Sequence, residues 1–211
     1  MRFQSSFLAA QILGSIEERV AAYKALALHA APEQSELLNC SILVAQDDWE
    51  GVLERFRGAG DKLPALIQYK IRALGELGHL DEMIATYDSA ESVLRLDTLP
   101  SCRLFVMAFS GRADAVHSLL SKHFRNFSSR DKAYWSFIAA QAAGAEDDEA
   151  RRVLVSFARD ADDETFRRRA QRHLEAAGPR RGPVLCTESL EIIATVEETI
   201  RKASGRRRLR S

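Results

Sequence analysis

The chain has 211 residues, and its 30 Lys and Arg residues are balanced by 30 Asp and Glu residues, so the formal net charge is zero. A hydrophobic fraction of 46% and a charged fraction of 28% indicate one or two folded domains and exclude a disordered chain. The abundance of Ala, Leu, Arg and Glu, with only 5 prolines and 11 glycines, favours helices over an all-β fold. No window approaches 18 apolar residues, so the sequence predicts no membrane-spanning helix.

The first 20 residues, MRFQSSFLAAQILGSIEERV, are predicted to begin with a helix. The alternative is a weak signal peptide, but the segment has no clear small-x-small cleavage site and runs directly into a charged stretch. The three cysteines, Cys40, Cys102 and Cys186, are widely spaced and form no C-x-x-C motif. Such cysteines are typical of buried or free thiols in a reducing compartment, which predicts a cytoplasmic location.

One pattern recurs along the chain: a turn residue followed by an amphipathic segment with acidic residues in its first turn. It is clearest from Gly78 to Ala90, GHLDEMIATYDSA, and it returns at Gly14, Gly111 and Gly144, with Asp47 in the same role. The steps between these turn residues are 33, 31, 33 and 33 residues. A period near 34 with a helix on each side of a short turn is the pattern of tetratricopeptide repeats (TPRs).

The repeats are degenerate. The ninth residue after the turn is aromatic in the first three units (Tyr23, Phe56 and Tyr87), but it is Leu120 in the fourth. Helix starts are also marked, by Pro64 in a first helical turn, by Ser128 or Ser129 as an N-cap, and by Ser15 and Glu18 as a capping box. Because each helix pair has an apolar stripe that it cannot bury alone, neighbouring pairs are expected to stack. The predicted fold is therefore all-α: a right-handed TPR-like solenoid of about five repeats, over residues 1–177.

The C-terminal part is expected to be organised differently. A very polar helix, Asp163 to Ala176, is predicted to close the solenoid as a terminal cap. A Gly/Pro/Arg linker follows over residues 178–184, then a C-terminal helix over 185–204 and a basic tail over 205–211.

No motif for catalysis or for a cofactor is present. The five histidines form no i, i+4 pair and no H-E-x-x-H, and there is no G-x-S-x-G, Walker A or G-x-G-x-x-G sequence. We therefore predict no catalytic, cofactor-binding or metal-binding residues and no enzyme activity. Four aromatic residues are candidates either for a peptide groove or for core packing, and the second interpretation is favoured: Trp49, Phe105, Phe109 and Trp135.

The segments CRLFVMAFSGRADAVHSLL (102–120) and YKIRALGELGHLDEMIATYDSAE (69–91) resemble the cytosolic helical-repeat extension of some bacterial rhomboid-family intramembrane serine proteases. The ending TVEETIRKASGRRRLRS is similar to the segment that leads into the first membrane helix of those proteins. The catalytic G-x-S-G motif of that family is absent, so no catalytic residue is carried over. The resemblance implies a cytosolic regulatory or recruitment domain without the membrane protease domain.

The function expected from the sequence is a non-catalytic protein–protein interaction module in the cytoplasm. Its basic tail gives the inner face of the plasma membrane as an alternative expected location. A protein or peptide partner would bind the concave face, where the first helices of successive pairs line a groove. The candidate groove residues are Asn39, Gln68, Arg72, Arg103 and Gln141. The candidate contacts to an anionic membrane surface are Arg201, Lys202, Arg206, Arg207, Arg208 and Arg210.

Three alternatives stay open at this stage. The first is a free-standing cytosolic TPR adaptor. The second is a nucleic-acid binder that uses the Arg-rich C-terminal third, which is disfavoured because aromatic residues do not interleave with the arginines. The third is a soluble enzyme with an unfamiliar helical site, which would need titratable groups that converge in one pocket.

Overall fold

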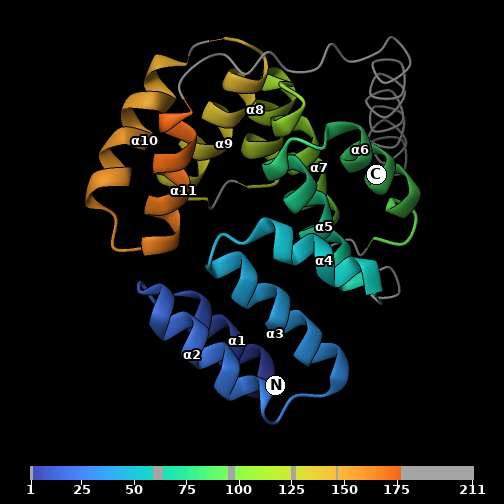
Figure 1. The fold of residues 1–211 in the computed structure, drawn as a ribbon. Coiled ribbons are helices and arrows are strands. Elements are labelled where there is room, and N and C mark those ends of the chain that lie inside the picture. The colour runs from blue at the N-terminus through green and yellow to red at the C-terminus, as the bar shows by residue number, and fades with distance from the viewer. Residues whose placement is uncertain (1, 59–63, 95–97, 125–126, 146, 177–211) are drawn as a thin grey trace, which may run out of the picture. The chain divides into compact units, whose positions relative to one another are not determined.

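The computed structural model describes residues 2–58, 64–94, 98–124, 127–145 and 147–176. These residues form eleven α-helices and no β-strand (Figure 1), which confirms the all-α prediction. The helices are α1 Arg2–Gln11, α2 Ile16–Ala27, α3 Pro32–Ala45, α4 Trp49–Gly58, α5 Pro64–Leu77, α6 Leu80–Ala90, α7 Leu99–Phe109, α8 Ala113–Lys122, α9 Ser129–Ala142, α10 Asp148–Asp160 and α11 Glu164–Glu175. The chain divides into residues 1–180 and 181–211. Residues 177–211, on which the predicted linker, C-terminal helix and basic tail fall, lie outside the described residues.

Each of the five predicted turn residues lies between two helices. Four of them have a positive φ: 63° at Asp47, 80° at Gly78, 72° at Gly111 and 69° at Gly144. This left-handed backbone reverses the chain after a helix, and glycine adopts it without a steric cost. At Gly111 space is restricted as well, because a Cβ atom there would lie 2.7 Å from the backbone nitrogen of Ala143.

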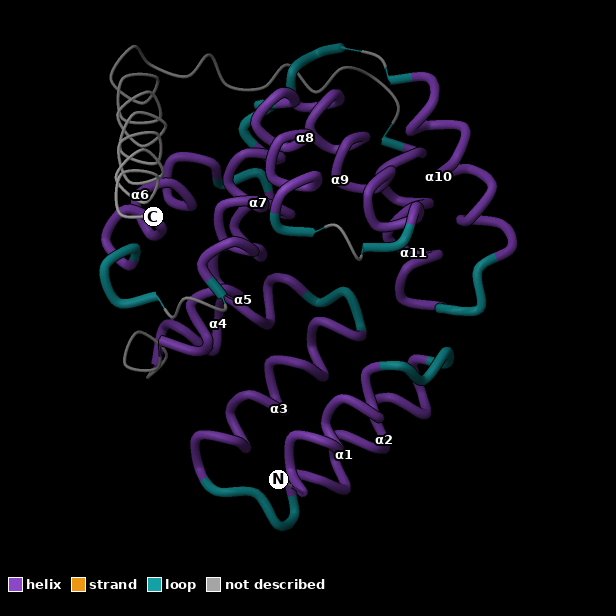
Figure 2. Tube along the Cα trace, turned by 180° about the vertical axis from the view of Figure 1, so that it is seen from behind, coloured by secondary structure: helices purple, strands orange, loops and turns teal. Residues whose placement is uncertain are grey.

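Three kinds of contact join the helices. The second helix of a pair packs on the first helix of the next pair, as α2 does on α3, α4 on α5, α6 on α7 and α8 on α9. Consecutive helices pack as antiparallel-type pairs across the short turns, α1 with α2, α3 with α4, α5 with α6, α7 with α8 and α9 with α10. In addition, the first helices of the last four pairs pack one on the next, so that α3 contacts α5, α5 contacts α7 and α7 contacts α9. Figure 2 shows the same helices from behind, with α1 and α2 side by side next to α3.

The core follows the apolar stripes read from the sequence. Trp49, Val52 and Phe56 of α4 pack with Cys40 of α3 and with Leu66 and Ala73 of α5 in one cluster. A second cluster joins Ala10, Tyr23, Leu38 and Ala45, from α1, α2 and α3. Burying each large apolar side chain stabilises the fold by roughly 1.5–3 kcal/mol. Trp49 has an exposed fraction of 2%, in agreement with the core interpretation of this residue.

Side-chain caps set several helix starts. The Ser128 hydroxyl accepts a hydrogen bond from the backbone N–H of Asp131 at 3.1 Å, so the first of the two predicted N-cap residues is the one used. Ser15 accepts from the N–H of Glu18 at 3.4 Å, as half of the predicted capping box. The carboxylates of Asp147 and Asp163 cap α10 and α11 in the same way.

The last described helix, predicted as a very polar closing helix, also has a buried face. Its bounds, Glu164–Glu175, agree with the predicted helix, but it is not polar all round. Thr165, Phe166, Ala170 and His173 are buried and form a single face at helical spacing. The buried face is hard to recognise in the sequence because arginines lie next to it. Two of them are themselves partly buried: the side chain of Arg169 is 11% exposed and that of Arg172 is 35% exposed.

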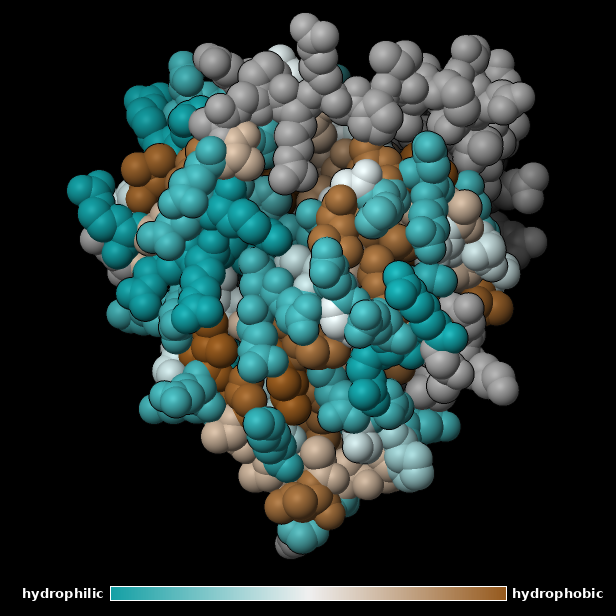
Figure 3. All heavy atoms as spheres, in the orientation of Figure 1, coloured by the Kyte–Doolittle hydropathy of each residue, from teal (hydrophilic) through white to brown (hydrophobic). Residues whose placement is uncertain are grey.

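Hydrophilic side chains cover most of the face of the molecule seen in Figure 3, and they leave separate, smaller apolar areas. None of the described helices is both long enough and apolar enough to span a membrane.

Candidate functional site

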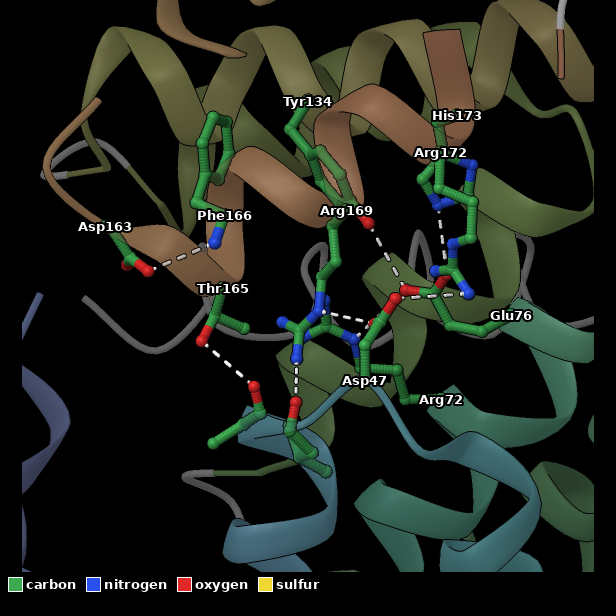
Figure 4. Close-up of polar contacts among 12 residues, drawn as sticks. Asp47, Arg72, Glu76, Tyr134, Asp163, Thr165, Phe166, Arg169, Arg172 and His173 are labelled. Atoms are coloured by element: carbon green, nitrogen blue, oxygen red, sulfur yellow. Dashed lines mark hydrogen bonds and ion pairs between the residues drawn. The ribbon is translucent and has the colours of Figure 1, made fainter. Parts of the chain in front are cut away.

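Helix α11 is held against the first helices of the array by a cluster of buried charged side chains. In Figure 4 the side chains of Arg169, Arg172 and His173 on α11 point toward Glu76 of α5 and toward Asp47 in the turn between α3 and α4. We call the surface of α3, α5, α7 and α9 that is turned to α11 the inner face. The residues that meet here are far apart in the sequence, so the cluster ties the last described helix to the middle of the chain.

Glu76 is the centre of this cluster, and its side chain has no exposed surface. One carboxylate oxygen lies 2.7 Å from Nη2 of Arg172 and 3.0 Å from Nε2 of His173. The other accepts a hydrogen bond from the Tyr134 hydroxyl at 3.2 Å and lies 3.5 Å from Nε of Arg72. A buried carboxylate is tolerated only when it has such partners, because removing a charge from water is costly.

The ionised form of Glu76 is favoured. Burial alone would raise the pKa of its carboxyl group, but the hydrogen bond with His173 and the charges of His173, Arg72 and Arg169 outweigh that effect. The pKa of Glu76 is therefore held well below its usual range. Burial raises the pKa of the Tyr134 hydroxyl, and the nearby Glu76 carboxylate raises it further, so Tyr134 stays a neutral hydrogen-bond donor.

Asp47 is the second carboxylate of the cluster, and α11 residues use it together with backbone carbonyls at the end of α3. Nε of Arg169 donates to Asp47 at 3.1 Å, and Nη1 of Arg172 lies 3.5 Å from the same carboxylate. Arg169 also donates to the carbonyl of Val44, and the Thr165 hydroxyl donates to the carbonyl of Ala45 at 3.1 Å. These carbonyls lack partners within α3 because they are in its last turn, so α11 satisfies them.

The guanidinium groups of the cluster are also stacked on aromatic rings. That of Arg72 lies 5.2 Å from the ring centre of Trp49, 5.5 Å from Phe105 and 5.3 Å from Trp135. That of Arg169 lies 4.9 Å from Trp49. Both cations therefore lie beside the same ring. Burial lowers the pKa of Arg169, and the charge of the nearby Arg72 lowers it further.

The start of α11 is joined to the first helix pair. The N–H of Glu164 donates to the carbonyl of Gly14 at 2.9 Å, and the N–H of Ile16 donates to the Glu164 carboxylate at 3.0 Å. Arg19 of α2 lies 3.2 Å from Asp163 and donates to the Thr165 hydroxyl at 3.1 Å. Helix α11 therefore contacts the first pair, α3, α5 and α9, and its position is fixed at several points.

A cavity of about 320 Å³ lies beside this junction. Side chains from α2, α5, α7, α9 and α11 form its walls. Its charged lining consists of Arg19, Arg72, Arg130, Arg169, Asp131 and Asp163. Its aromatic lining consists of Phe105, Phe127, Tyr134, Trp135 and Phe166. The arrangement brings cationic groups and flat rings to one partly open cavity.

The structure brings two of the five predicted groove residues into contact with α11 or its cluster. Arg72 belongs to the buried cluster and lines the cavity. Gln141 of α9 donates from its side-chain amide to the carbonyl of His173 at 3.2 Å. Both lie on first helices, as expected, but their polar groups are used within the chain.

The other three predicted groove residues are placed differently. Arg103 of α7 donates to the Tyr87 hydroxyl at 3.0 Å and to Glu91 at 2.9 Å, so it joins α7 to the end of α6. Asn39 of α3 and Gln68 of α5 are half-buried, and Gln68 lies one helical turn before Arg72 on the same side of α5. The six basic residues proposed for membrane contact lie outside the described residues.

Sequence reasoning missed Asp47, Glu76, Tyr134 and the α11 residues as members of one site. A signal was available in α11, where Thr165, Phe166, Arg169, Arg172 and His173 recur at the spacing of one helix face. Asp47 was read only as a turn residue. Glu76 resembled any acidic residue near the end of a helix.

Other candidate chemistry is limited in the described part of the chain. It holds no group of three or more His, Cys, Asp or Glu residues placed to bind a metal ion. The thiols of Cys40 and Cys102 are free and buried, and burial raises their pKa values to about 11 and about 12. They are therefore poor nucleophiles at neutral pH.

Comparisons with protein-family models, with curated proteins and with solved structures gave no match to this chain. The site is consequently interpreted from its own geometry.

Proposed function

We propose that the chain is a non-catalytic protein–protein interaction module, built as a right-handed TPR-like solenoid whose inner face recognises a partner segment. The even spacing of five helix pairs along the sequence supports the repeat assignment. The packing of α3 on α5, α5 on α7 and α7 on α9 supports it too, because such packing makes a continuous surface from the first helices.

The observation that carries the proposal is the way α11 is bound. The inner face holds α11 through carboxylates (Asp47, Glu76), an amide (Gln141), an aromatic ring (Trp49) and the carbonyls of Val44 and Ala45 at the end of α3. The same chemistry suits a partner segment, which would bind next to α11 along α3 and α5, where Asn39 and Gln68 are half-buried. Recognition of a helix or an extended peptide in such a groove needs no catalytic group.

The test is site-specific photocrosslinking of the full chain in the cells of its source. A photoreactive residue replaces Gln68 on the inner face in one variant, and the exposed Glu82 of α6 in the control variant. The proposal expects a discrete protein to be crosslinked from position 68 and not from position 82. Identical crosslinking patterns from both positions, or none from position 68, would contradict it.

The sequence resemblance suggests a narrower role, as the cytosolic regulatory or recruitment domain of a rhomboid-type membrane protease. Its support is the resemblance, together with the basic tail that would contact an anionic membrane surface. Co-sedimentation with anionic and neutral vesicles, for the full chain and for a version that ends at Ser204, tests it. Tail-dependent binding to anionic vesicles alone is expected; no binding would instead favour a free-standing cytosolic adaptor.

The alternative function, nucleic-acid binding, has less support from the structure. Arg169 and Arg172, which belong to the Arg-rich C-terminal third, are paired with Asp47 and Glu76. Nucleic-acid binding that falls steeply between low and moderate salt would support this alternative.

A further inference from the structure

The cavity beside α11 has an excess of positive charge. Four arginines and two aspartates line it, which gives a formal surplus of two positive charges in a space of about 320 Å³. The carboxylates behind the arginines, Glu76 and Asp47, reduce this surplus without removing it. Arg172 shares both of them, so five arginines face four carboxylates and a formal surplus of one positive charge is left. Cations held away from water without full compensation are costly, and an anion in the cavity would offset that cost.

Two of the four arginines keep donor capacity. The buried Nε atoms of Arg72 and Arg130 have no hydrogen-bond partner, although each lies within 4 Å of a carboxylate, Glu76 at 3.5 Å and Asp131 at 3.7 Å. Arg19 and Arg169, in contrast, donate to backbone carbonyls and to Asp163 and Asp47, so they hold the walls in place. Buried donors without partners are rare in folded proteins. Because these Nε atoms are themselves buried, an anion in the cavity would act on the two guanidinium groups through their charge.

The two aspartates in the lining already have donors of their own. Asp163 accepts from the N–H of Phe166 at 3.1 Å and from Arg19 at 3.2 Å. Asp131 accepts from the Ser128 hydroxyl at 2.6 Å. Asp163 is therefore engaged at the start of α11, whereas Asp131 uses one oxygen at the start of α9 and has the other 3.7 Å from Nε of Arg130.

The aromatic part of the lining indicates which uncharged part of a ligand would fit the cavity. Phe105, Tyr134, Trp135 and Phe166 present flat rings, and the guanidinium of Arg130 lies 4.6 Å from the ring centre of Phe166. Ligand cavities generally measure about 300–1,000 Å³, so this one is at the small end of the range. We propose that the cavity binds a small molecule in which a phosphate or carboxylate group is attached to a flat ring. This site does not depend on the protein-interaction function proposed above.

The test is isothermal titration calorimetry of the full chain with phenyl phosphate, with benzoate and with phenol, which has the same ring but no charge. The expected result is saturable binding of one anion per chain and no binding of phenol; the stronger of the two anions then shows whether phosphate or carboxylate is preferred. The Arg130→Gln variant should bind that anion about tenfold or more weakly, because a charge-assisted contact is lost. The matched control is Arg168→Gln, which removes an exposed arginine of α11 and should leave the affinity unchanged within about twofold.

A second variant keeps the test decisive if Arg130→Gln is poorly folded. Ser101→Phe adds bulk to the cavity wall without changing a charge, and it should abolish binding. The proposal is overturned if neither anion binds up to about 10 mM. It is equally overturned if phenol binds as well as the anions do, or if Arg168→Gln weakens binding as much as Arg130→Gln does.

Discussion

The first helix pair and α11 both adjoin α3, but opposite kinds of interaction attach them. The α1–α2 pair is packed on α3 through apolar and aromatic side chains: Phe7 lies 5.6 Å from Tyr23 between ring centres, and Leu38 is fully buried among them. Helix α11 is attached through Asp47, Glu76 and the side chains that share them.

The difference has consequences for stability and regulation. The stabilisation that apolar packing provides is roughly proportional to the buried area and nearly independent of pH. A buried ion cluster depends on every member, since the loss of one leaves the others with uncompensated charge. The α11 junction is therefore expected to respond more to protonation than the packing of α1 and α2 on α3 does.

The largest expected effect comes from removing the central carboxylate. Glu76→Ala leaves Arg72, Arg172 and His173 without their shared partner and should lower the free energy of unfolding by about 3–5 kcal/mol. Equilibrium urea unfolding at pH 7 measures this. The matched control is Glu82→Ala on the exposed side of α6, which should change stability by no more than about 0.5 kcal/mol. A loss below about 1 kcal/mol for Glu76→Ala would mean that the cluster does not hold α11.

A cavity in the first helix pair should cost somewhat less. Leu38→Ala removes a side chain with no exposed surface from the cluster of α1, α2 and α3, and should destabilise the chain by about 3 kcal/mol. The comparison is sharpened by repeating urea unfolding at low and high salt. The loss of unfolding free energy in Leu38→Ala should be the same at both salt concentrations, whereas the loss in Glu76→Ala should differ between them. If both losses respond equally to salt, the α1–α2 pair and α11 are not attached by different kinds of interaction.

The pH response gives the next effect. Because the pKa of Glu76 is lower in the folded chain than in the unfolded chain, its ionised form stabilises the fold above the ordinary carboxyl pKa. That contribution is lost as the pH falls from about 5 toward the folded-state value. Urea unfolding across this range should show a steep loss of stability in the unmodified chain and a shallower one in Glu76→Gln. Parallel curves would show that Glu76 does not titrate with folding.

The smallest effect concerns the cap at the start of α11. Asp163→Ala removes an N-cap and the partner of Arg19, so it should cost about 1–2 kcal/mol. Ser128→Ala removes only the N-cap of α9 and should cost about 1 kcal/mol. Thermal unfolding of the two variants compares them, and an equal loss would show that the Arg19–Asp163 pair adds nothing.

The sequence predicts the helices well because their signals are local. The turn residues Asp47, Gly78, Gly111 and Gly144 mark reversals by their own backbone preference, and the apolar periodicity between them follows from one side of each helix being buried. Pro64 and Ser128 mark helix starts for equally local reasons.

The candidate site was predictable only in part, because its partners are distant in the sequence. Glu76 and His173 are 97 residues apart, and Arg169 and Asp47 are 122 residues apart. Nothing in a local pattern says which arginine meets which carboxylate, so Arg72 was identified as a polar residue on a first helix but not as a buried one. Arg103 shows the converse: it has the same local appearance and lies against α6 instead.

The most direct test of the central claim, that Glu76 holds α11 on the inner face, is hydrogen–deuterium exchange followed by mass spectrometry in the unmodified chain and in Glu76→Gln. The account predicts that amides of Glu164–Glu175 lose protection in the variant while those of α2 and α3 keep theirs. Unchanged protection of α11, or an equal loss in all three helices, would contradict it.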